Sequence, residues 1–201
     1  MGPMESTIPE LLVRWQSYYV IIGSSGAALT GLQFVVMALI AESPFAANAG
    51  EEGVAAFGSP IVVHFGAALL LSAMLSAPWP DGARIATAVD VSGAAGMLYV
   101  LNVVRRTRRQ SSYKMVFEDW LWHIILPFAS YTAFLVGGLM LPSAPVTALF
   151  VAAVAPAALL FIGIHNAWDS ITYTVLRSAR AKAEAKAEAK AKAEASKSGP
   201  V

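Results

Sequence analysis

The sequence predicts an all-α integral membrane protein built as a five-transmembrane-helix bundle. Two observations predict this class: 57% of the 201 residues are hydrophobic, and only 13% are charged. An average soluble domain is about 25% charged, and here the apolar residues are gathered into runs that suit a bilayer. The length fits one compact bundle. The formal net charge of +1 provides no basic field that would attract nucleic acid.

The apolar runs divide the chain into three parts. Residues 1–17 are expected to form an amphipathic lead-in, residues 18–176 the five-span bundle, and residues 177–201 a charged, Ala/Lys/Glu-rich helical tail. Strong helix propensity makes the tail a solvated extension of the last helix. The five spans are expected at residues 18–41, 60–77, 83–104, 120–141 and 146–168.

Proline and glycine positions indicate where the spans begin, bend and pack. Pro60 is a favourable first residue for the second span, and Pro127 predicts a kink in the fourth. Gly23, Ala27 and Gly31 recur every four residues in the first span. Such a ridge of small residues allows another helix to approach closely.

Basic residues predict how the bundle sits in the membrane. Twelve of the fourteen Lys and Arg residues fall in the segment after the third span, including Arg105–Arg109, or in the tail. The positive-inside rule then places the C-terminus in the cytoplasm and the N-terminus outside. Arg105–Arg109 is also expected to contact anionic lipid head groups. The Ala-rich composition suggests a bacterial inner membrane, and the small-residue faces suggest a homo-oligomer or a membrane partner protein.

All three histidines of the chain are expected at the cytoplasmic membrane face. His64 opens the second span there, His123 opens the fourth, and His165 closes the fifth. Asp119 precedes His123 by four residues and Asp169 follows His165 by four, so each pair shares one face of its helix. The mirrored spacing predicts a shared site if these two spans are antiparallel neighbours.

Imidazoles with carboxylates are the ligands of zinc, non-haem iron and manganese. Glu118 and Glu42 lie at a similar height. Alternatively, two of the histidines are axial ligands of a haem. The remaining alternative is structural: the Asp–His pairs satisfy each other at the interface, while Trp120, Trp122 and Trp168 form an aromatic belt.

A second group of polar residues lies deeper in the predicted membrane. Asp90 of the third span and Gln33 of the first predict a channel or proton-linked transporter, because a carboxylate inside a bilayer is costly unless it is paired, protonated or hydrated. The alternative is a hydrogen-bonded clamp between the two spans. A third hypothesis is a non-catalytic subunit of a membrane complex. The absence of cysteine excludes thiolate chemistry and iron–sulfur clusters.

Overall fold

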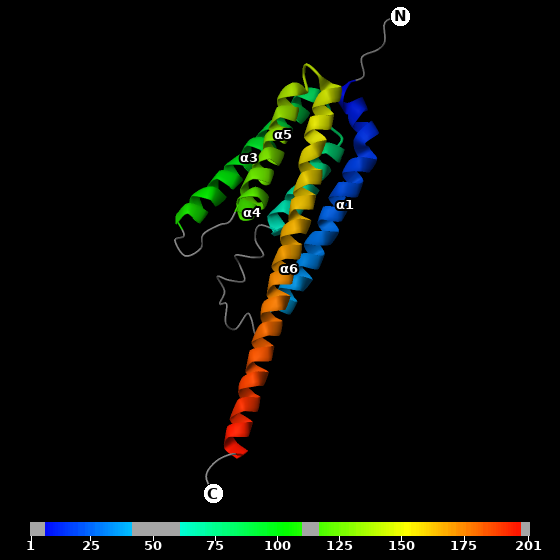
Figure 1. Ribbon diagram of the computed structural model, residues 1–201. Helices are drawn as coiled ribbons and strands as arrows, with labels where there is room; N and C mark the ends of the chain where they lie inside the picture. The colour runs from blue at the N-terminus through cyan, green and yellow to red at the C-terminus, as the bar shows by residue number, and fades with distance from the viewer. Residues whose placement is uncertain (1–6, 42–60, 110–116, 198–201) are drawn as a thin grey trace, which may run out of the picture.

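The computed structural model describes residues 7–41, 61–109 and 117–197, and every regular element within these ranges is helical (Figure 1). The elements in chain order are α1 (Ile8–Ala41), the helix Ile61–Ser76, α3 (Gly82–Arg109), α4 (Phe117–Trp120), the π-helical turn η1 (Leu121–Ile125), α5 (Leu126–Met140) and α6 (Pro145–Lys197). The predicted all-α class is therefore confirmed for these residues.

Among the described residues, four helices are long and apolar enough to cross a membrane. They cover residues 8–39, 82–106, 117–140 and 145–173. Large apolar side chains such as Leu70, Leu98 and Phe161 are exposed on the outside of the bundle, as expected where lipid is the solvent. The predicted second span is present as the shorter apolar helix Ile61–Ser76. Its 16 residues rise only about 24 Å, against a hydrocarbon core of about 30 Å.

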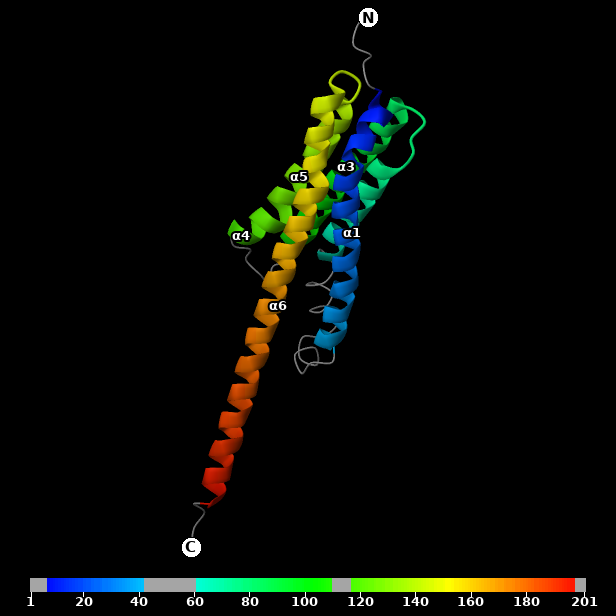
Figure 2. The ribbon, with the colours of Figure 1, turned by 90° about the vertical axis from the view of Figure 1, so that its right-hand side faces the viewer.

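Helix α5 lies between α3 and α6, and glycines allow both contacts (Figures 1 and 2). A Cβ atom on Gly93 of α3 would lie 2.7 Å from the backbone nitrogen of Leu135 in α5. A Cβ atom on Gly137 of α5 would lie 2.8 Å from the Cβ of Ala152 in α6. Only glycine leaves room for backbones this close, so these two positions determine the spacing of the three helices.

Helix α1 packs against α6 and against the helix Ile61–Ser76. The predicted ridge of Gly23, Ala27 and Gly31 is only partly correct. Gly23 does face Ser72, but Ala27 is exposed and a Cβ atom on Gly31 would meet nothing within 4 Å. Gly26 makes the second close approach, to the carbonyl oxygen of Phe65. The contact therefore follows positions three apart on α1, which is one of the two ridge directions by which helices pack.

The predicted lead-in and first span form one continuous helix from Ile8. The side chain of Glu10 caps the start of this helix by accepting a hydrogen bond from the backbone N–H of Thr7 at 2.9 Å. Such caps satisfy the free amides at the start of a helix. At the same end of the bundle, Asp81 caps α3 by accepting from the N–H of Arg84 at 2.9 Å. Ile8 also lies against Gly82, so α1 and α3 begin at the same level.

The predicted irregularity near Pro127 is present as the π-helical turn Leu121–Ile125. Pro127 has no N–H for the carbonyl of His123, and its ring would crowd that carbonyl in a regular α-helix. The wider π turn relieves the conflict just before α5 begins. Such turns are frequent at functional sites, and this one carries Trp122 and His123.

Helix α6 runs without interruption from the bundle into the tail. It passes through Pro156 and continues to Lys197, and its last third projects alone, away from the other helices (Figures 1 and 2). Near Pro156, where the α-helical ladder lacks one N–H, the hydroxyl of Tyr18 donates to the carbonyl of Ala153 at 2.5 Å. The carbonyl that Pro156 leaves without a helical donor is that of Ala152, so this bond joins α1 to α6 one residue away from it.

Candidate metal centre

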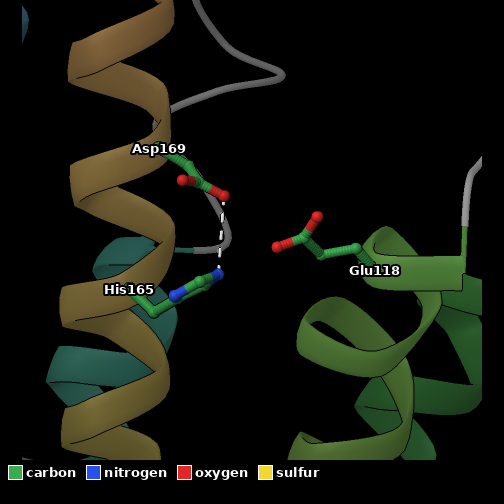
Figure 3. Close-up of side chains that lie close together, drawn as sticks. All are labelled: Glu118, His165 and Asp169. Carbon is green, nitrogen blue, oxygen red and sulfur yellow. Dashed lines mark ion pairs between the residues drawn. The ribbon is translucent and has the colours of Figure 1, made fainter.

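Three side chains from two elements bring metal-ligating atoms together at one end of the bundle. Glu118 of α4 faces His165 and Asp169 of α6, and the three ligand atoms lie within 4.8 Å of one another (Figure 3). Glu118 is exposed and His165 is half-buried, while the side chain of Asp169 is 62% exposed. The group therefore lies at the boundary between the packed bundle and water.

His165 and Asp169 form the pair that their spacing predicts. Nε2 of His165 lies 3.4 Å from Oδ2 of Asp169, a separation longer than an ordinary hydrogen bond. Nε2 is also buried and makes no hydrogen bond to any described residue. The nitrogen consequently points into the space between two carboxylates without being saturated by either, which is the arrangement that a bound cation requires.

Trp122 holds the imidazole of His165 from one side. The two rings are stacked, with centroids 3.5 Å apart and an interplanar angle of 15°. Trp122 in turn contacts Phe161, one turn earlier on α6, at a centroid separation of 6.1 Å. Because a ring stacked over a flat aromatic face cannot rotate freely, Trp122 fixes the plane in which Nε2 points.

His123 contacts the backbone of Asp119, the residue whose side chain is predicted to pair with it. Its Nδ1 lies 3.2 Å from the carbonyl oxygen of Asp119. A carbonyl oxygen only accepts, so Nδ1 carries the proton and Nε2 retains its lone pair in the neutral ring. His123 lies within the π turn Leu121–Ile125, and such a turn is wider than a regular α-helical one. The pairing of the two side chains stays a prediction.

His64 lies in the interior beside His123. It is 2% exposed, its Nδ1 has no hydrogen-bond partner among the described residues, and the two imidazoles are close enough to interact electrostatically. The neighbouring Phe65 packs on Gly163 of α6, and Asn166, one turn further along α6, is also 2% exposed. His64 thus lies near His123, and Trp122, next to His123 in the chain, stacks on His165. Of the three histidines, His165 alone belongs to the cluster of ligand atoms within 4.8 Å.

Asp90 and Gln33, the residues of the transport hypothesis, are not brought together. Helices α1 and α3 begin at one level, since Ile8 contacts Gly82. At 1.5 Å per residue, Asp90 then lies about 12 Å and Gln33 about 37 Å along their helices. Gln33 is buried on α1, whereas Asp90 faces Gly138 of α5.

The hydroxyls of the first span that might have partnered Asp90 bond within their own helix. Ser24, Ser25 and Thr30 donate to carbonyls three or four residues earlier in α1. These three hydroxyls therefore do not form the hydrogen bonds to Asp90 that would join the first span to the third.

No known protein family, curated protein or solved structure matches this chain. Its function is therefore inferred from the chemistry of the described residues.

Proposed function

We propose that this protein is a multi-pass membrane protein that binds one divalent first-row transition metal ion, namely zinc, iron(II) or manganese(II). The ion would be held by Glu118, His165 and Asp169. One observation carries the proposal: an imidazole nitrogen and two carboxylate oxygens, from two separate elements, lie within 4.8 Å of one another. One nitrogen and two oxygens are ligands that zinc, iron(II) and manganese(II) accept, whereas soft metals such as copper(I) prefer sulfur ligands.

Three protein ligands leave a coordination position open, which distinguishes catalytic sites from closed structural ones. Such an ion can activate a water molecule or polarise a substrate oxygen. The exposure of Glu118 and Asp169 leaves this position accessible from the water phase. Trp122 positions His165, a supporting role that tunes affinity in other metal sites.

The haem alternative receives less support from the same geometry. A haem needs an apolar slot between axial ligands, but Nε2 of His165 faces two carboxylates. His64 and His123 remain predicted ligands of the same ion, which they would reach only if their side chains changed position. Otherwise they are neighbours of the site that do not bind the ion. Asp119 remains a predicted participant through its position beside Glu118.

We further propose that the helix Ile61–Ser76 is a fifth membrane-embedded element, with the N-terminus outside and the C-terminus in the cytoplasm of a bacterial cell. The basic segments support this orientation. Arg105 and Arg106 are exposed at the end of α3, where anionic head groups would lie, while the side chains of Arg108 and Arg109 lie outside the described residues. A homo-oligomer or membrane partner stays a prediction.

The proposal is tested by metal titration of the full chain, purified in mild detergent without a histidine tag and stripped with a chelator. Cobalt(II) serves as a visible probe and zinc as its competitor. We expect one equivalent of metal to bind. His165→Ala, Glu118→Gln and Asp169→Asn should each weaken binding by more than about 10–100-fold, the range seen when only the groups that support metal ligands are lost.

Glu188→Gln provides the matched control, because Glu188 is an exposed carboxylate further along the same helix. It should leave the titration unchanged. Binding that is absent, or that all four variants reduce alike, would contradict the metal proposal. The structural alternative would then hold, in which His165 is paired with Asp169 and stacked on Trp122.

A further inference from the structure

A carboxyl group lies inside the membrane-crossing part of the bundle, separate from the candidate metal centre. Asp90 is in the third turn of α3, about 12 Å from the start of the helix, within a hydrocarbon core of about 30 Å. It faces α5 at Gly138, where an added Cβ atom would overlap its Oδ1. Gly138 therefore provides the space that the carboxyl occupies.

One oxygen of this carboxyl is enclosed without a donor. Its Oδ1 is buried and has no hydrogen-bond partner among the described residues. The residue as a whole is only half-buried, and its neighbours Val91 on α3 and Leu139 on α5 are 63% and 64% exposed. The seam between α3 and α5 thus covers one oxygen, while the rest of the group is open toward lipid.

No cation faces Asp90 from the described parts of the helices packed around it. On α3 the nearest basic residue is Arg84, six positions earlier, and it pairs with Asp81 at 3.3 Å. On α5 the titratable residue is Tyr131, which meets Gly96 nearly two turns away.

The other described helices place no charge beside Asp90. Arg14 of α1 is at a similar level, but it lies with Val146 and Phe150 of α6. Helix α6 carries no titratable side chain between Pro145 and Ile164. The helix Ile61–Ser76 carries only His64, which lies at the opposite end of the bundle beside His123.

We propose that Asp90 is a proton-binding site within the bilayer. An unpaired carboxylate in such surroundings costs several kcal/mol, and protonation removes that cost. The neutral acid is the resting form. Release breaks its O–H bond and transfers the proton to a water molecule that reaches the carboxyl group, and rebinding reverses the step. This site is independent of the proposed metal centre at the other end of the bundle.

The decisive test is an infrared difference spectrum between the unaltered protein and Asp90→Asn, both reconstituted in phospholipid vesicles. A protonated carboxyl has a C=O stretch well separated from the bands of a carboxylate. We expect the unaltered protein to show this stretch at neutral pH, Asp90→Asn to lose it, and alkaline titration to convert it to carboxylate bands. Carboxylate bands at neutral pH that disappear in Asp90→Asn would overturn the proposal.

A second measurement tests access from the lipid side. A hydrophobic carbodiimide adds across the O–H bond of a protonated acid, with the oxygen going to the central carbon and the proton to a nitrogen. Mass spectrometry should find one adduct on the peptide containing Asp90, with a yield that falls as pH rises. Asp81, an ion-paired surface carboxylate, is the internal control and should stay unlabelled. Failure to label Asp90 would overturn the lipid-facing opening.

Discussion

The imidazole of His165 lies flat against the indole of Trp122, with ring centroids 3.5 Å apart and planes inclined by 15°. The contact joins the π turn to α6 at the point where Glu118 and Asp169 approach the same imidazole. It fixes the direction of Nε2, the nitrogen proposed as a metal ligand, so the entropy of ordering this ring is already lost in the folded protein.

Removing the stacked indole should weaken metal binding without removing a ligand. We expect Trp122→Ala to reduce the affinity about tenfold, comparable to the loss of other supporting contacts at metal sites, and Trp122→Phe to retain most of it. Cobalt(II) titration measures both. Trp168→Ala is the control, since Trp168 precedes Asp169 directly but is 71% exposed. Equal losses at both tryptophans would contradict the positioning role of Trp122.

Acid should release the metal. A proton competes with the ion for Nε2 of His165 and for the two carboxylates, because the ligand atoms must be deprotonated to bind a metal. Lowering the pH therefore favours the metal-free protein. Zinc competition at a series of pH values measures the change in affinity. An affinity that does not change as the pH is lowered would contradict a metal site built from these three side chains.

The sequence predicted one half of the candidate site better than the other. His165 and Asp169 lie on a regular part of α6, so four-residue spacing correctly placed them together. Asp119 and His123 have the same spacing, but the π turn lies between them and their contact uses the backbone carbonyl. Glu118 takes the place expected for Asp119, and Trp122, assigned to the aromatic belt, contacts His165 instead.

A signal for these two residues was present in the sequence. Glu118 and Trp122 are themselves four apart, and Pro127 marks where regular spacing fails. The tertiary relationship of α4 to α6 could not be read from hydrophobic runs, because five such runs do not specify their order in space. The helical membrane class followed from composition alone. The number of spans could not be read from composition. The helix Ile61–Ser76 is apolar like the other four but shorter than they are.

Close backbone packing makes one glycine substitution costly and another neutral. Gly93→Ala would place its Cβ 2.7 Å from the backbone nitrogen of Leu135, and a backbone cannot move aside as a side-chain end can. We expect the free energy of unfolding to fall by about 1–3 kcal/mol. Gly31→Ala, where nothing lies within 4 Å, should change it little. Thermal unfolding in bicelles compares the two, and equal effects would contradict the α3–α5 packing.

The tail should be dispensable for the stability of the bundle. The described side chains from Ala179 to Lys192 are all exposed, so we expect deletion of residues 179–201 to leave the packing of the bundle unchanged. We expect helical circular dichroism to fall in proportion to the residues removed, with an unchanged thermal midpoint. A lowered midpoint would show that the tail packs on the bundle. A normal cobalt(II) titration of the shortened chain would place the candidate site entirely within the bundle.

The uninterrupted course of α6 has a mechanical consequence. The same helix that carries His165 and Asp169 continues to Lys197, about 42 Å beyond Asp169, whereas Glu118 belongs to α4. A sideways force on the far end of this rod acts through a long lever arm on two of the three ligands while the third stays with its own helix. A protein that binds the tail and bends α6 would thereby change the distance between the side chains of Asp169 and Glu118.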